Sequence, residues 1–141
     1  MPYEFQVAVD CAQPHVLADW WAETLGWKVV VSDPEFIRQM IAEGYVTEAD
    51  TRTHNGSLVF ADAAAIDRPE DPGRRIYFQR VPEAKTAKNR WHLDVRVGPE
   101  NVAAEKERLI ARGASYLYDG QQGPHTWVTM ADPEGNEFCI S

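Results

Sequence analysis

The same succession of elements is predicted twice along the chain, and this repeat limits the folds that the sequence can form. Apolar and polar residues alternate over residues 4–11 and again over residues 91–97, which is typical of strands with one buried face. An amphipathic helix follows each strand, over residues 14–25 and 99–112. Both helices begin with a proline and end before a glycine, the residues favoured at those two helix ends. The sequence therefore indicates a duplicated unit.

Short strands are predicted to complete both halves. In the first half they cover residues 27–31, 57–61 and 75–81, with a loop over residues 65–75, and in the second half they cover residues 115–118, 126–130 and 136–140. A short amphipathic helix is predicted within an insertion at residues 33–55. We expect an α+β fold in which the helices cover one face of the sheets and leave the opposite face open.

The chain length fits one domain, because domains average about 150 residues. We expect a single domain, 1–141, with a first module at residues 1–82, a connector at residues 83–90 and a second module at residues 91–141. The connector is polar and contains lysines, which is typical of a linking segment.

The charge balance excludes one class of partner. The chain has 22 Asp and Glu residues against 14 Lys and Arg residues, a net charge of -8, so we expect no nucleic-acid partner. No apolar stretch of about 18 residues occurs and no secretory signal is recognisable, so we expect a cytoplasmic protein without a membrane partner. Cys11 and Cys139 lie far apart, a spacing that suggests neither a disulfide framework nor a thiolate metal site.

Three short motifs give the chain a family resemblance. They are Leu-Gly-Trp at residues 25–27, Lys-Asn-Arg-Trp-His-Leu-Asp at residues 88–94, and Asp-Pro-Glu-Gly-Asn-Glu-Phe at residues 132–138. Together they resemble the glyoxalase-like branch of the vicinal oxygen chelate superfamily, which includes glyoxalases, bleomycin-resistance proteins and extradiol dioxygenases. The resemblance implies two βαβββ modules whose mostly antiparallel sheets curl around a cavity, with the helices outside. It also implies a divalent metal held by the first and fourth strands of each module.

Four polar residues occupy the strand positions where this resemblance places metal ligands. Strand alternation puts Gln6, Gln79, His92 and Glu137 on the face away from the helices. Imidazole and carboxylate are sound ligands for Zn, Ni, Fe or Mn, whereas the two amides are weaker ones. Glu137 is also a candidate catalytic base. With two amides in the set, the cofactor is either one divalent metal or none.

Four further residues are candidates for substrate binding. Asp94 shares a strand face with His92, where it forms either part of the site or a structural pair, and Trp127 is predicted near the cavity. Phe36 and Met40 lie on the helix of the insertion, which either covers the mouth of the cavity or protects a sheet edge.

Two functions follow from these candidates. One is a metal-dependent lyase, isomerase or dioxygenase acting on a substrate with adjacent oxygen atoms. The other is a metal-free protein that binds or sequesters a small molecule, as bleomycin-resistance proteins do. Both have a small-molecule ligand, and both allow a homodimer, because two modules can pair within one chain or between two chains.

Overall fold

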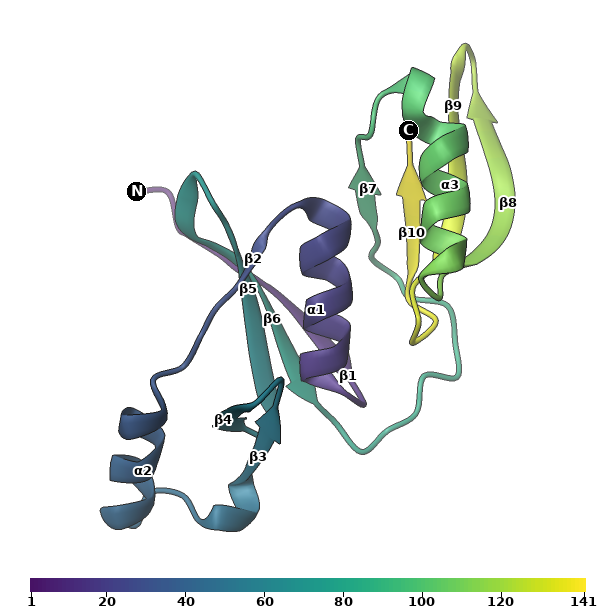
Figure 1. The fold of residues 1–141 in the computed structure, drawn as a ribbon. Helices are drawn as coiled ribbons and strands as arrows, with labels where there is room; N and C mark the ends of the chain where they lie inside the picture. The colour runs from purple at the N-terminus through teal and green to yellow at the C-terminus, as the bar shows by residue number, and fades with distance from the viewer. The chain divides into compact units, whose positions relative to one another are not determined.

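The protein is described over residues 1–141 by a computed structural model, which contains two compact units. Unit 1 is Met1–Pro82 and unit 2 is Glu83–Ser141, and each is built on a four-stranded sheet (Figure 1). The prediction of an α+β fold with two βαβββ repeats and mostly antiparallel sheets is confirmed. None of the helices combines the length and the apolar character needed to cross a membrane.

Unit 1 contains the first repeat and its insertion. Its elements are β1 (Val7–Cys11), α1 (Pro14–Leu25), β2 (Lys28–Val29), α2 (Pro34–Ala42), the 3-10 helix η1 (Glu48–Asp50), β3 (Thr51–His54), β4 (Ser57–Phe60), β5 (Ala63–Arg68) and β6 (Asp71–Arg80). The main sheet has the order β1-β6-β5-β2, with β1 and β6 parallel and the other pairs antiparallel.

Helix α1 forms the core of unit 1 against one face of this sheet. Leu17 and Trp21 on the helix are buried, as are Ile66 on β5 and Phe78 on β6. Each such side chain stabilises the fold by about 1.5–3 kcal/mol when fully buried. The alternation within β5 and β6 leaves the other face of the sheet to more polar residues.

The insertion is longer than predicted. The sequence indicated residues 33–55, but β4 pairs with β3 in a separate two-stranded sheet, so the inserted structure continues to Phe60. The turn consists of Asn55 and Gly56, both with positive φ, which is the pair that two-residue hairpins favour. The hairpin is fixed to α1, because Asp19 accepts hydrogen bonds from His54 Nε2 at 2.7 Å and Asn55 Nδ2 at 3.3 Å.

The predicted loop at residues 65–75 is wrong. This segment forms most of β5 and the beginning of β6, which join in a tight turn. The register shifts between Asp67 and Arg68, next to the turn, and Pro72 and Gly73 follow in the outer part of β6. Proline and glycine are tolerated at such irregular strand positions, so they did not mark a loop here.

Unit 2 repeats the topology without an insertion. Its elements are β7 (Leu93–Val95), the 3-10 helix η2 (Pro99–Asn101), α3 (Val102–Ala111), β8 (Ser115–Gln122), β9 (His125–Ala131) and β10 (Glu137–Ile140). The sheet order is β7-β10-β9-β8, so the first and last strands of the unit are parallel neighbours, as in unit 1.

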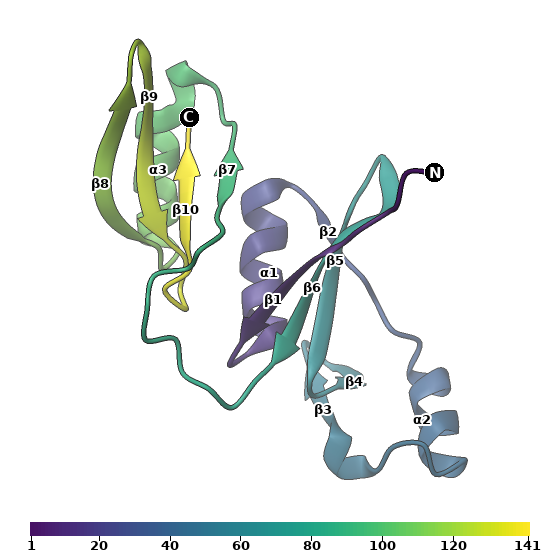
Figure 2. The same cartoon turned by 180° about the vertical axis from the view of Figure 1, so that it is seen from behind.

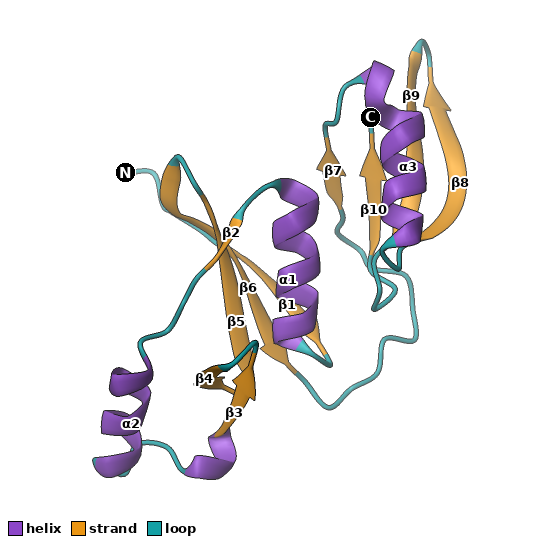
Figure 3. Ribbon diagram, viewed as in Figure 1, coloured by secondary structure: helices purple, strands orange, loops and turns teal.

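One face of the unit 2 sheet is covered by α3. Leu109 on the helix, Met130 on β9, and Phe138 and Ile140 on β10 are buried in this layer. The single helix lies on one side of the four strands (Figure 3), and the view from behind shows the opposite face of the sheet without a helix (Figure 2). The expectation that the helices leave one face open is therefore confirmed for this unit.

Candidate functional site

The open face of the unit 2 sheet carries most of the polar residues that the sequence singled out. In β7 and β10, Leu93 and Phe138 are paired in register and Phe138 is buried toward α3. Because side chains alternate along a strand, Asp94 and Cys139, the next pair in register, lie on the opposite face. His92, two residues before Asp94, shares this face.

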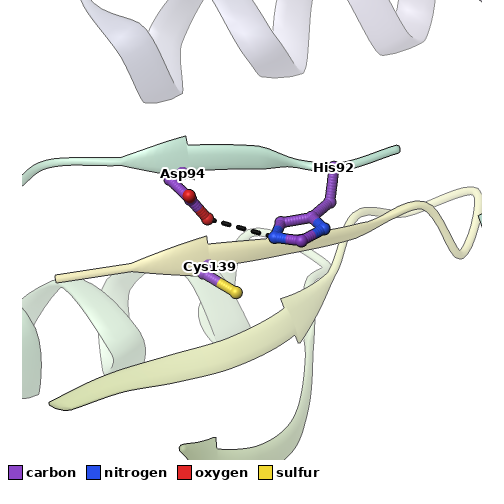
Figure 4. A group of neighbouring side chains, drawn as sticks. All are labelled: His92, Asp94 and Cys139. Atoms are coloured by element: carbon purple, nitrogen blue, oxygen red, sulfur yellow. Dashed lines mark ion pairs between the residues drawn. The ribbon is translucent and has the colours of Figure 1, made fainter. Parts of the chain in front are cut away.

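His92 and Asp94 lie beside each other on this face, within salt-bridge distance. His92 Nε2 lies 3.2 Å from Asp94 Oδ1, and the two side chains are 43% and 68% exposed. Cys139 is buried beside them, and the three potential ligand atoms all lie within 4.8 Å of one another (Figure 4). The structure therefore groups an imidazole, a carboxylate and a thiol from two neighbouring strands.

Glu137 has different partners from the ones predicted. One carboxylate oxygen accepts a hydrogen bond from Lys85 Nζ at 3.1 Å, and the other accepts one from the backbone N–H of Asn89 at 3.1 Å. Burial by itself would raise the pKa of Glu137, but the backbone and Lys85 hydrogen bonds, with the Lys85 charge, lower this pKa below its ordinary value. Glu137 thus anchors residues of the connector to β10.

Gln6 and Gln79 both belong to unit 1 and lie far apart on its sheet. Gln6 Oε1 accepts a hydrogen bond from Arg75 Nε at 2.9 Å, in the middle of β6. Gln79 lies next to the last residue of β6, paired in register with Asp10. Asp10 lies four positions after Gln6 along extended chain, a distance of about 13 Å. The two amides therefore do not hold one ion together.

The chemistry of these donors decides how well the implied metal fits. Gln6 and Glu137 each bind a cationic side chain, and a divalent ion at either position would meet that charge at close range. His92 is a suitable ligand, since its imidazole is exposed beside a carboxylate. The four predicted ligands together do not form a site for a divalent metal. Of the four, only His92 is a suitable ligand.

Trp127 lies on β9, where alternation from Thr129, the partner in register of Cys139, places it on the open face. It pairs in register with Gly120 on β8, and its indole covers that glycine so closely that a Cβ atom there would lie 2.1 Å from the ring. The ring of His125 lies 5.6 Å from the indole, centre to centre. A fixed aromatic surface therefore extends the open face of β9.

Helix α2 of the insertion carries the two predicted substrate-binding residues Phe36 and Met40. On α2, Ile37 is the buried residue, whereas Phe36 is 50% exposed and Met40 is partly exposed. The helix packs against β4. Binding of substrate by Phe36 and Met40 stays a prediction.

Two features of the site were missed from the sequence. Cys139 lies two residues after Glu137, so strand alternation could have placed it on the open face. Lys85 and Asn89 lie in the connector, which was interpreted as a linking segment, and no local pattern connects them to Glu137.

Comparison with known protein families shows to which family the chain belongs. The model of the glyoxalase-like domain family matches residues 6–141. The chain belongs to this family. The resemblance to the vicinal oxygen chelate superfamily is thereby confirmed, and no curated protein was found to match the sequence.

Solved structures share the fold of this glyoxalase-like domain at low sequence identity. A variant of the fosfomycin resistance protein FosX from Listeria monocytogenes, in complex with Mn(II) and 1S,2S-dihydroxypropylphosphonic acid, has 10% identity and a TM-score of 0.64, covering 99% of this chain and 91% of its own. A glyoxalase/bleomycin resistance protein/dioxygenase family enzyme from Burkholderia phytofirmans PsJN has 17% identity and a TM-score of 0.62, covering 96% and 94%. The oxidase ChaP-H2 has 13% identity and a TM-score of 0.59, covering 99% and 93%.

Proposed function

We propose that this glyoxalase-like protein binds a small molecule with adjacent oxygen atoms on the open face of the unit 2 sheet. The observation that carries the proposal is the exposed His92–Asp94 pair, 3.2 Å apart, on a sheet face that no helix of the unit covers. Exposed charged residues are common on surfaces, but this pair lies above a buried thiol and on the same face as the fixed indole of Trp127.

The pair suits a ligand that presents two neighbouring oxygen atoms. An imidazole ring can donate or accept a hydrogen bond, and a carboxylate accepts one, so two adjacent hydroxyl groups can bind both side chains. With Asp94 beside it, His92 can also accept a proton from such a hydroxyl group. Trp127 would contact the apolar part of the ligand.

A metal-dependent enzyme is the second candidate function. The grouping of His92, Asp94 and Cys139 supports it, as does the Mn(II) bound by the FosX relative. A metal held there would polarise a bound oxygen atom as a Lewis acid. We place metal-free binding first, because Glu137 and Gln6 are paired with the cationic side chains of Lys85 and Arg75.

Two isomeric probes test the proposal. Catechol has adjacent hydroxyl groups and resorcinol does not. Calorimetry should show that the protein binds catechol at least about tenfold more tightly than resorcinol, because resorcinol would lose about one hydrogen bond to the pair. His92→Ala should remove most of this preference. Equal binding of both isomers, or none of either, would refute the proposal. Binding that survives a chelator supports the metal-free function, and binding that a chelator abolishes supports the metal-dependent one.

A further inference from the structure

We propose that unit 1 contains a binding site for a small neutral molecule with a primary carboxamide group. The site is a cleft of about 410 Å³ between helix α1, the hairpin of β3 and β4, and the outer edge of β5. This volume is within the range of small-molecule sites. None of the lining residues belongs to unit 2, so the cleft is separate from the site proposed around His92 and Asp94.

The cleft exists because strand β2 is short. β2 pairs with β5 only through Lys28 and Val29, and Val30 donates one further backbone hydrogen bond, to Ala65. From Ala65 back to Ala63, the outer edge of β5 pairs with no strand, and the cleft lies along it. Most of its walls are apolar, and they include Val30, Val31, Val59, Phe60, Ala63, Ala64 and Ala65.

Two imidazole rings supply polar groups to this cleft. His15 on α1 and His54 on β3 both line it, and their ring centres lie 5.0 Å apart. His15 is 7% exposed, and the side chain of His54 is 15% exposed. Both rings form one hydrogen bond through Nε2 at 2.7 Å, His15 with the carbonyl of Phe60 and His54 with the carboxylate of Asp19.

These two bonds determine which ring nitrogen carries the proton. A backbone carbonyl and a carboxylate only accept hydrogen bonds, so Nε2 is the donor in both rings. In the neutral ring Nδ1 is then an acceptor, and no group of the protein donates to Nδ1 of His15 or His54. Burial lowers the pKa of His15, which keeps that ring neutral at pH 7. The cleft therefore holds two acceptors that lack donors.

Paired acceptors favour a ligand with an NH2 group, because its two N–H bonds can each donate to one imidazole. The surrounding charges disfavour a protonated amine, since Arg75 lines the cleft and the charge of Arg52 acts on His15. The lining includes one carboxylate, Asp19. A carboxamide is neutral and keeps the NH2 group, and its carbonyl can accept a hydrogen bond from the hydroxyl of Ser57, which also lines the cleft. The apolar body of the ligand would bury against the valines.

Benzamide and acetophenone test the site, because acetophenone has a methyl group in place of the NH2 group and otherwise the same shape. NMR titration of the full-length protein at neutral pH should give a dissociation constant of about 1 mM or lower for benzamide. Acetophenone should bind at least about tenfold more weakly, because it cannot donate to the imidazoles. Equal binding of the two compounds, or no binding of benzamide, would overturn the proposal.

Variants of the two rings locate the binding. His54→Phe keeps a ring but removes the acceptor, so it should weaken benzamide binding at least about fivefold, and His15→Phe should do the same. His125→Phe, on β9 of unit 2, is the matched control and should leave the affinity unchanged. An equal loss in all three variants would overturn the proposal. His92→Ala should not affect benzamide binding, and His54→Phe should not affect the catechol preference, so the two proposals fail separately.

The protonation of the rings can be measured in the unaltered protein, which keeps the proposal testable if His15→Phe or His54→Phe folds poorly. NMR spectra that correlate the ring nitrogens with the ring carbon-bound protons should show the Nε2–H form for His15 and His54 at neutral pH. Addition of benzamide should shift the Nδ1 resonance of both rings, and acetophenone should not. A proton on Nδ1 of either ring, or Nδ1 resonances that benzamide leaves in place, would overturn the proposal.

Discussion

Lys85 donates a hydrogen bond to Glu137 at 3.1 Å, across 52 positions of the sequence, and so joins the connector to the last strand of unit 2. The side chains of Lys85 and Glu137 are 26% and 14% exposed. Glu137→Gln should therefore lower the free energy of unfolding at pH 7 by about 1–2 kcal/mol, as expected for loss of a charged hydrogen bond. Urea denaturation measures this difference.

The same pair predicts a pH dependence. Because the folded protein lowers the pKa of Glu137, the carboxylate contributes stability that is fully present above its ordinary pKa near 4.5 and is lost as the pH falls below it. The difference in unfolding free energy between wild type and Glu137→Gln should shrink between pH 5 and pH 3. A difference that grows in acid would contradict this explanation.

His15 predicts a second pH dependence, in unit 1. Burial lowers the pKa of His15, and it outweighs the opposing hydrogen bond to the carbonyl of Phe60, at 2.7 Å. A buried neutral histidine must take up charge in acid, so this part of the stability is present above the ordinary pKa of 6.5 and is lost progressively below it. The free energy of unfolding, measured by urea denaturation, should fall less between pH 8 and pH 5 for His15→Gln than for wild type. His125→Gln, at an exposed position, should behave as wild type.

The contact between Gly120 and Trp127 predicts a local clash. An added methyl group at Gly120 would lie 2.1 Å from the indole, so Gly120→Ala must displace Trp127. We expect a loss of about 1–3 kcal/mol of stability, the usual cost of overpacking, together with a changed near-ultraviolet circular dichroism spectrum. In a Trp127→Ala background the same change should cost much less. An equal cost in both backgrounds would locate the effect in the backbone.

Truncation of Leu109 measures how much the packing of α3 on its sheet contributes to stability. Leu109 is 1% exposed, so Leu109→Ala should lower the free energy of unfolding by about 2–5 kcal/mol. Ile110→Ala, a neighbour that is 38% exposed, is the matched control and should cost less than about 1 kcal/mol. Chemical denaturation of the two variants compares them directly, and similar losses would mean that Leu109 is not a core residue in solution.

Much of the fold could be predicted because its signals are local. The periodicity of apolar residues identified the helices, and alternation placed His92 and Asp94 together on the open face. The hairpin of β3 and β4 was missed although Asn55-Gly56 is a strong turn signal, because the segment before it is polar on both faces.

The site could be predicted only in part, because its contacts depend on strand register. Alternation assigns a residue to a face, but it does not say which residue of a neighbouring strand lies beside it. The neighbours of Asp94 and Gln79 follow from parallel pairings between strands that are distant in sequence. The salt bridge of Lys85 depends on the path of the connector, which has no periodic pattern.

The parallel pairing of first and last strands also bears on how the chain folds as it is synthesised. In unit 2, β10 lies between β7 and β9, so β7 gains its only neighbour in the sheet after the last strand has been made. Until Ile140 has left the ribosome, β7 has unpaired backbone groups and α3 lacks Phe138 to pack against. Nascent chains that stop before Glu137 should therefore bind chaperones and be cut by proteases at β7, whereas chains extended past Ser141 should resist both.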